Sequence, residues 1–255
     1  MLIVISPAKT LDFENINDNL PMTNPRFLEY SNIIMDRLKE LDSYSIGKLM
    51  KISDKLSSLN KERFDTWKDT LENSNHCLLA FQGDVYKGLD VGSFTEEDLF
   101  YANDHLRILS GLYGVLRPFD GINPYRLEMG SKLDVLGEKN LYEFWKDTLK
   151  NSIYEELRKH DESTLINLAS KEYFKSIEAI EKEDDIKVIT PTFKEFRNGE
   201  YKIISLKAKR ARGLMSRYII QNQINNPEEL KGFNEEGYEY NEELSTENEW
   251  IFTRG

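Results

Sequence analysis

The sequence predicts a mixed α/β fold in which residues 1–255 form a single compact domain, with a central mixed sheet flanked by helices. Short apolar runs rich in β-branched residues alternate with segments whose apolar residues recur at helical spacing. An Asn-Gly pair between two apolar runs predicts an antiparallel hairpin within the sheet. No Gly/Ser-rich linker, internal repeat or low-complexity segment marks a domain boundary.

Three short apolar runs are predicted to be buried strands. They are Leu2–Ser6, Cys77–Phe81 and Leu165–Leu168. Each is followed by small or polar residues, which are typical of the loop after a strand in α/β proteins.

The carboxyl-terminal third predicts further strands. Lys187–Ile189, extended by Phe193–Phe196, precedes the turn pair Asn198-Gly199, and Tyr201–Leu206 is expected to pair back across it. Trp250–Phe252 is predicted to close the acidic tail as an edge strand.

Helices are predicted where apolar residues repeat every three or four positions. The spacing favours helices at Arg26–Leu41, Asn140–Leu157 and Lys207–Arg217. Thr95 followed by three acids predicts a helix start, and that helix is expected to run to about Ser110 and end at Gly111.

Ser45–Trp67 predicts two short helices joined by a tight break. Ser53 can cap the second helix, and its backbone N–H groups, with Lys51 beside them, could bind a DNA phosphate. Helix-hairpin-helix motifs usually place Gly-apolar-Gly at this break, whereas here Lys51 and Ser53 flank Ile52. An ordinary helical hairpin is the alternative.

Leu106–Gly130 concentrates Gly and Pro between long polar side chains, a pattern that suits a binding surface held by a constrained backbone. The alternative is a pair of tight turns with surface arginines. We expect four cations placed beside such turns or after predicted strands to face a common cleft. These are Lys9, Arg117, Arg126 and Lys175.

Polar residues after strands or turns also suggest a small-molecule site. They are Lys9, Asp84 with Tyr86, Arg126 with Glu128, and Asn167 with Ser170. Asp84 or Glu128 could act as general acid or base, with Arg117 or Arg126 holding an anion. A plain salt bridge to a neighbouring arginine is the alternative for each carboxylate.

The charge is uneven. The net charge is −11, yet Tyr201–Asn226 holds six Lys or Arg and no acid, whereas Glu228–Glu249 holds nine acids and one Lys. An unbalanced basic helix favours a polyanion partner. Its cations are Lys207, Lys209, Arg210, Arg212 and Arg217.

Composition narrows the class of protein. One cysteine, Cys77, excludes a disulfide within the chain, and three scattered histidines give no zinc-type spacing, so no metal site and no cofactor are expected. Cys77 lies in an apolar run and is predicted to be structural. No apolar run is long enough to span a membrane, and the apolar start is too short for a signal peptide. A soluble cytoplasmic protein is expected.

Six stretches in order closely resemble the peroxide stress resistance protein YaaA family. They are ISPAKTLDF, FQGDVYKGL, LSGLYGVLRPFDGINPYRLEMG, NLYEFW, INLASKEYFK and AKRARGLMSRYII, and GFNEEGY follows them. The resemblance covers essentially the whole chain. It implies a bacterial cytosolic protein that protects against hydrogen peroxide by limiting free intracellular iron. It also implies a single α/β fold with a positively charged cleft and DNA binding through a helix-hairpin-helix element, matched here by residues 45–67.

Two functions remain open from the sequence. The first is DNA binding, with Lys and Arg neutralising phosphates and with Tyr86, Tyr125 and Tyr173 stacking on unpaired bases. The second is an enzyme acting on a nucleotide or nucleobase at the strand ends. Direct iron binding fits the process but not the residues, because the Cys and His side chains form no cluster in the sequence.

Overall fold

The computed structural model describes residues 1–14 and 19–255, which are built around an eight-stranded mixed sheet. The strand order is β11-β12-β9-β8-β1-β5-β6, and β10 pairs with β9. The strands are β1 (Leu2–Ile5), β5 (Leu106–Ser110), β6 (Gly114–Leu116), β8 (Thr164–Leu168), β9 (Lys187–Arg197), β10 (Glu200–Lys202), β11 (Glu239–Tyr240) and β12 (Glu249–Arg254).

The centre of the sheet is parallel. Strand β1 pairs with β5 on one side and β8 on the other, β8 pairs with β9, and β9 pairs with β12, all in parallel. Strands β6, β10 and β11 pair antiparallel with β5, β9 and β12, respectively. Every residue of β1, β5 and β8 is buried, as expected for parallel strands covered on both faces.

Two smaller strand pairs lie beside the main sheet. In one, β2 (Thr10–Leu11) pairs with β4 (Phe81–Gln82), and in the other, β3 (Asn75–His76) pairs with β7 (Gly121–Ile122). The first pair joins the segment after β1 to the segment after α4, and the second joins the segment after α3 to the segment after β6.

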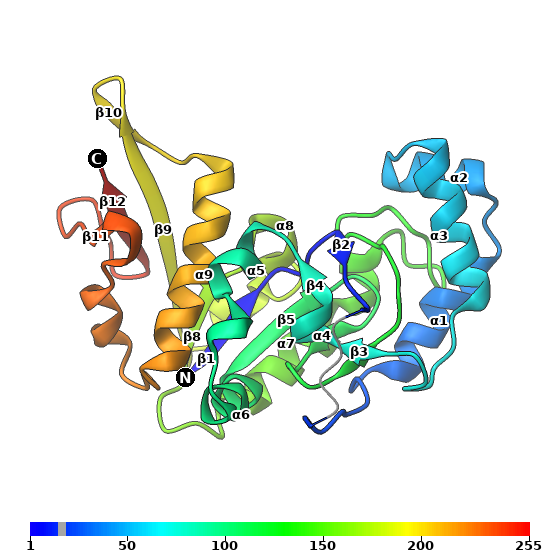
Figure 1. Cartoon of the computed structure of the whole chain (residues 1–255), viewed down its shortest axis with the longest axis horizontal. Helices are drawn as coiled ribbons and strands as arrows, with labels where there is room; N and C mark the ends of the chain where they lie inside the picture. Colours follow the sequence, from blue (N-terminus) through cyan, green and yellow to red (C-terminus); the bar gives the residue numbers. More distant parts are fainter. Residues whose placement is uncertain (15–18) are drawn as a thin grey trace.

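Helices surround the sheet (Figure 1). The described α-helices are α1 (Leu28–Lys39), α2 (Ser43–Met50), α3 (Asp54–Thr66), α4 (Cys77–Ala80), α5 (Asp84–Leu89), α6 (Glu96–His105), α7 (Leu141–Leu157), α8 (Lys171–Phe174) and α9 (Ser205–Gln221). The described 3-10 turns are η1 (Val91–Ser93), η2 (Glu178–Lys182), η3 (Pro227–Gly232) and η4 (Glu235–Gly237). Helix α9 packs against α5, α6 and strand β9, whereas α7 contacts β6 and η2.

Helices α5 and α9 cross at unusually short range because glycines stand at the crossing. A Cβ atom on Gly88 would lie 2.2 Å from the Arg210 carbonyl oxygen, and one on Gly213 would lie 1.8 Å from the Val85 carbonyl oxygen. Only glycine leaves room for backbones at this distance. The crossing fixes the basic helix α9 against α5.

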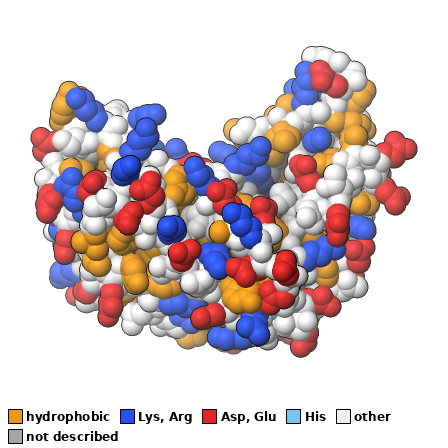
Figure 2. Space-filling model, turned by 180° about the vertical axis from the view of Figure 1, so that it is seen from behind, with side chains coloured by type: hydrophobic (Ala, Val, Ile, Leu, Met, Phe, Trp, Pro, Cys, Tyr) orange, Lys and Arg blue, Asp and Glu red, His pale blue; other side chains and the backbone are white. Residues whose placement is uncertain are grey.

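Two projections stand at opposite ends of the molecule, with a hollow between them that we call the concave face (Figures 1 and 2). One projection is formed by α1–α3 and the other by the β9–β10 hairpin. Because β1 and β8 run parallel to β9, their carboxyl ends face the same edge as the hairpin.

The mixed α/β fold, the strands at Leu2–Ser6 and Leu165–Leu168 and the Asn198-Gly199 hairpin are confirmed. Asn198 and Gly199 both take positive φ, 53° and 85°, as this hairpin turn requires. The helices predicted at Arg26–Leu41, Asn140–Leu157 and Lys207–Arg217 are α1, α7 and α9.

Four predicted elements differ. The helix starting after Thr95 ends at His105, and residues 106–110 form the central strand β5 instead. Cys77–Phe81 is mostly the short helix α4, because a brief apolar run does not distinguish a strand from a buried helical turn. The returning strand of the hairpin stops at Lys202. Strand β12 is not at the edge of the sheet, since β11 pairs outside it.

Candidate functional site

A cavity of about 400 Å³ lies at the carboxyl ends of β1 and β8, bordered by the first turns of α5 and α8 and by α9. Four stretches that are distant in sequence meet there: the loop after β1, the loop after β4, Glu128 and the loop after β8. Carboxyl ends of parallel strands are where α/β proteins usually bind ligands. We call it the strand-end cavity. Its polar lining is Ser6, Lys9, Thr10, Gln82, Asp84, Glu128, Ser170, Glu172, Lys209 and Arg212.

Glu128 connects two of the cations that the sequence singled out. Its Oε1 accepts hydrogen bonds from Arg126 Nη2 at 2.9 Å and Nε at 3.2 Å, and it lies 3.1 Å from Lys9 Nζ. Its Oε2 is buried, and no donor to it occurs in the described part of the chain. The Glu128 side chain is 14% exposed and the Lys9 side chain 67%, so Lys9 is the more accessible partner of the pair.

Helix α9 contributes cations of two kinds. Arg210 Nε pairs with Glu236 Oε1 at 2.6 Å, and Arg217 Nη2 pairs with Glu235 Oε2 at 3.1 Å. The basic run, unbalanced in the sequence, is therefore partly balanced in space by the acidic tail. Lys207, Lys209 and Arg212 make no ion pair or side-chain hydrogen bond within residues 1–14 and 19–255.

Arg212 is the most constrained of these three. Its guanidinium is partly buried against the strand-end cavity, and this burial lowers its pKa from the ordinary value. An arginine without a partner loses hydration and gains no charge pairing in return. The neighbouring Gly213 is locked against α5, so the backbone that carries Arg212 has little freedom to move away.

Asp84 begins α5 and also borders the strand-end cavity. Its carboxylate has no ion pair or hydrogen-bond partner elsewhere in the described chain. An acid in the first turn of a helix is favoured by the helix dipole, which accounts for its position without a ligand. The cavity is thus lined by two unpaired cations, Lys209 and Arg212 on α9, and by an unpaired anion, Asp84 on α5.

Two serines join the ends of β1 and β8 at the floor of the cavity. Ser170 N donates to Ser6 Oγ at 2.9 Å, and Ser6 Oγ lies 3.3 Å from Ser170 Oγ. Tyr86 OH donates to the Ser6 carbonyl oxygen at 3.2 Å. Burial raises the pKa of Tyr86 well above 10, so its hydroxyl stays protonated as a donor.

Several other residues predicted to bind a ligand lie outside the strand-end cavity. Arg117 pairs with the buried Asp120 at 2.8 Å, and Lys175 lies over the Tyr142 ring; neither lines the strand-end cavity. Asn167 donates to Thr190 Oγ1 at 3.2 Å between strands β8 and β9. Of the four cations expected to share a cleft, the structure brings Lys9 and Arg126 together, through Glu128.

The three tyrosines considered for base stacking are all buried. Tyr86 and Tyr173 line the strand-end cavity, whereas Tyr125 lies in the core with its hydroxyl 2.7 Å from Ser110 Oγ. Stacking on Tyr125 would require this region to open.

Lys51 and Ser53 are exposed at the turn between α2 and α3. Lys51 takes the left-handed conformation with φ 53°, and its N–H donates to the Gly47 carbonyl oxygen. Ser53 is the N-cap residue of α3 but makes no side-chain capping bond. The two-helix hairpin is present, and a helix-hairpin-helix nucleic-acid motif is not confirmed by it.

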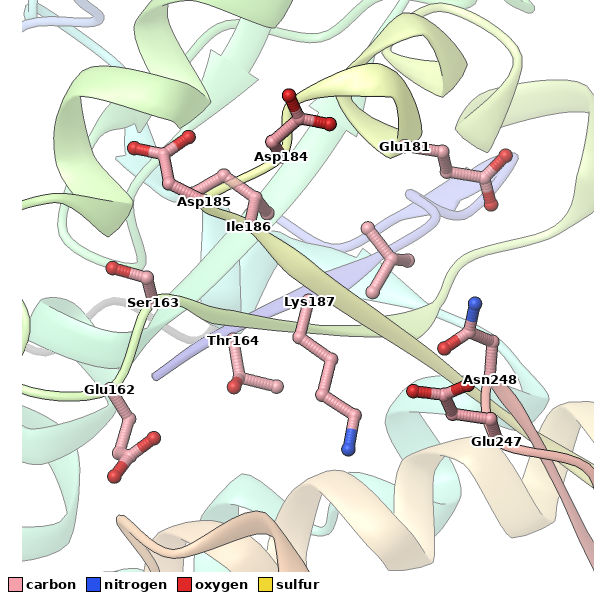
Figure 3. A pocket seen from close by; sticks show the side chains of 11 residues that line it. Glu162, Ser163, Thr164, Glu181, Asp184, Asp185, Ile186, Lys187, Glu247 and Asn248 are labelled. Atoms are coloured by element: carbon pink, nitrogen blue, oxygen red, sulfur yellow. The ribbon is translucent and has the colours of Figure 1, made fainter.

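A second, larger hollow of about 680 Å³ lies at the amino ends of β8 and β9, at the opposite ends of these strands from the concave face (Figure 3). It carries five carboxylates and Lys187. Figure 3 shows these carboxylates spread around the hollow and not gathered at one point. Within the described residues, no group of three or more His, Cys, Asp or Glu is arranged to hold a metal ion.

Cys77 lies in the core. Its Sγ donates to the Arg117 carbonyl oxygen at 3.0 Å, and burial raises its pKa well above the ordinary value. Elsewhere, no helix in the described chain combines the length and apolar character needed to cross a membrane.

Comparison with known proteins gives a consistent result over the whole length. A family model described as peroxide stress protein YaaA matches residues 1–244. A UPF0246 protein of Clostridium botulinum Eklund 17B is 63% identical over 254 residues, which cover 99% of each chain. UPF0246 proteins of Aliivibrio fischeri ES114 and Colwellia psychrerythraea 34H are 50% and 48% identical over 256 residues, covering 100% of this chain and 98% and 99% of theirs.

Proposed function

The chain belongs to the peroxide stress protein YaaA family, and we propose that it acts in the response to hydrogen peroxide by binding DNA across its concave face. The proposed location is the cytoplasm, where DNA is present.

The observation that carries the proposal is the set of unpaired cations on α9. Lys207 and Lys209 are exposed and have no acidic partner in the described residues, although the protein as a whole carries a net charge of −11. Figure 2 shows further Lys and Arg side chains on both slopes of the concave face. A local concentration of positive charge in an acidic protein favours a polyanion, because each phosphate contact releases condensed counterions.

Lys51 and Ser53 extend the proposed contact to the other projection, at the α2–α3 turn. Backbone N–H groups at the start of α3 could donate hydrogen bonds to a phosphate there even without glycines. Arg210 and Arg217 contribute less in this proposal, because Glu236 and Glu235 already neutralise them. Arg117 is likewise held by Asp120.

Protein bound along the DNA would limit the damage that iron and peroxide cause there. Bound protein would exclude iron from the phosphate backbone and reduce the damage that peroxide and iron cause at that position. In this account the effect on iron is indirect and requires no iron ligand on the protein.

Survival under peroxide tests the proposal. A bacterial host lacking its own family member would express either the wild-type chain or a Lys207→Gln/Lys209→Gln variant, with Arg158→Gln as control. Arg158 is an exposed arginine that caps α7. We expect the double variant to protect less than the wild type and the control to protect equally. Equal protection by all three would contradict the role of these lysines.

A second candidate, an enzyme acting on a nucleotide or nucleobase, is favoured by Glu128. Glu128 lines the strand-end cavity and its Oε1 pairs with both Lys9 and Arg126, so a carboxylate held by two cations borders a space of small-molecule size. Chromatography of nucleosides and nucleotides incubated with the protein tests it, with Glu128→Gln expected to abolish any conversion.

A further inference from the structure

We propose that the strand-end cavity binds one nucleoside monophosphate unit, with Arg212 and Lys209 contacting its phosphate and Asp84 accepting hydrogen bonds from its base or sugar. The unit is either a free mononucleotide or a nucleotide rotated out of a DNA strand. The second source rests on the proposed DNA-binding function.

The anionic end of the ligand is inferred from Arg212. Its guanidinium is partly buried with no partner in the described chain, and Lys209, one helical turn away on the same side of α9, lines the same cavity without an ion pair. Arginine presents a planar fork of donors that matches a phosphate in bidentate geometry. A bound phosphate would supply the charge partner that the folded chain leaves out.

The opposite end of the ligand is inferred from Asp84. Asp84 lines the cavity, is partly exposed, and has no hydrogen-bond donor or ion-pair partner in the described chain. Inorganic phosphate alone would offer the Asp84 carboxylate no donor and would bring negative charge towards it. The ligand therefore carries an anion and, some distance from it, N–H or O–H groups, as a nucleoside monophosphate does.

The size and the walls of the cavity agree with such a ligand. Its volume of about 400 Å³ lies within the usual range of small-molecule pockets, roughly 300–1,000 Å³. Pro7, Val85, Leu168, Tyr86 and Tyr173 supply apolar and aromatic surface between the charged groups. A base has apolar faces and polar edges, so it can contact both kinds of lining at once.

The position of the cavity allows both sources of ligand. It lies at the carboxyl ends of β1 and β8, at the edge of the sheet that faces the concave face. A DNA strand crossing that face could therefore place one nucleotide into it. Extruding a base is least costly where it is mismatched or unpaired.

The fluorescent base 2-aminopurine tests the proposal in two arms. In the first, the 5′-monophosphate of 2-aminopurine riboside is titrated into the protein, with the riboside lacking phosphate as comparison. In the second, 2-aminopurine is placed opposite a mismatch in duplex DNA, where its emission rises when it leaves the stack. Arg212→Gln, Arg212→Lys and Asp84→Asn are compared with Arg158→Gln, and a melting curve is recorded for each variant.

We expect saturable binding in at least one arm. Arg212→Gln should weaken it roughly tenfold or more, since hydrogen bonds to charged groups are the strong ones. Arg212→Lys should restore part of the affinity, and Arg158→Gln should change nothing. A response in the first arm alone identifies a free nucleotide, and a response in the second alone an extruded one.

Three results would overturn the proposal: no binding in either arm, equal binding of the riboside without phosphate, or binding unaffected in the folded Arg212 and Asp84 variants. If Arg212→Gln fails to fold, Arg212→Lys and Asp84→Asn decide the matter. The two proposals fail separately. Salt-dependent binding of duplex DNA without either fluorescence response removes the nucleotide site alone, whereas nucleotide binding without duplex binding removes the DNA-binding function alone.

Discussion

Gly88 on α5 and Gly213 on α9 lie where the two helices cross, and neither position has room for a side chain. A Cβ atom on Gly213 would come within 1.8 Å of the Val85 carbonyl oxygen and 2.7 Å of the Leu89 nitrogen. These neighbours are backbone atoms, so relief requires the helices to separate. That separation would move Arg212 away from the strand-end cavity.

Gly213→Ala should therefore destabilise the protein strongly. Overpacking usually costs about 1–3 kcal/mol, and backbone neighbours that cannot shift should place this variant at or above the upper end. Urea unfolding followed by circular dichroism measures the effect. Gly92→Ala is the matched control, because no atom lies within 4 Å of a Cβ there, and it should change the free energy of unfolding by less than about 0.5 kcal/mol. Similar midpoints for the two variants would show that the crossing is looser than described.

A buried ion network predicts acid sensitivity. Glu156 bonds both Arg107 and Arg26, with Arg107 Nε at 2.5 Å from Glu156 Oε2. Burial acts to raise the pKa of Glu156, but the charges of Arg107 and Arg26 and their hydrogen bonds outweigh it, so the pKa is lowered from 4.5. A lowered carboxyl pKa contributes stability that is present above about pH 4.5 and is lost as the pH falls through the native value.

Glu156→Gln should cost roughly 3–5 kcal/mol at neutral pH, because it leaves Arg107 buried without its charge partner. The variant should also lose part of the dependence of stability on pH below about 4.5. Glu155→Gln, at the exposed neighbouring position, is the control and should remain close to wild type. Equal stability of the two variants at neutral pH would rule out the network as a major contribution.

The histidine pair His105 and His160 affects stability at higher pH than Glu156 does. His160 lies 4.8 Å from His105 between ring centres, and burial, with the nearby N-terminal ammonium, lowers its pKa from 6.5 to about 4. The unfolded chain therefore binds more protons than the native chain between about pH 4 and 6.5, so stability falls as the pH drops through that window. His160→Gln should flatten this part of the profile. An unchanged slope between pH 4 and 6.5 would assign the effect to other groups.

Cys77 is expected not to serve as a peroxide sensor. A thiol reacts as its thiolate, and burial raises the pKa of Cys77 well above the ordinary value. Cys77→Ser should keep its protection against peroxide, and a thiol reagent should modify the wild type only after unfolding. Rapid modification of the native protein, or loss of protection in a folded Cys77→Ser variant, would show a redox role.

Those parts of the fold that have a strong local sequence pattern could be predicted. The β-branched run at Leu2–Ser6 and the Asn198-Gly199 turn form elements that local sequence specifies. The strand Leu106–Ser110 could not be predicted in the same way, because it follows α6 without a break in the sequence pattern. It becomes a strand by pairing with β1 on one side and β6 on the other. Tertiary pairing decided that element, and a single sequence does not contain that pairing.

The candidate site could be predicted in outline, as polar residues at strand ends, but its pairings could not. The sequence gives no sign that Glu236 neutralises Arg210 while Arg212 stays unpaired, because the acidic tail folds back onto α9 only in three dimensions. The glycines at 88 and 213 mark only the close crossing of α5 and α9, and they do not indicate which arginine is paired.

The central claim is that α9 binds DNA phosphates, and the salt dependence of duplex binding tests it most directly. Each neutralised phosphate contributes roughly −0.9 to the slope of log affinity against log salt concentration. The Lys207→Gln/Lys209→Gln variant should therefore flatten the wild-type slope by up to about 1.8, with an unchanged melting temperature, whereas Arg158→Gln should keep it. The same slope for a folded double variant and the wild type would contradict the account.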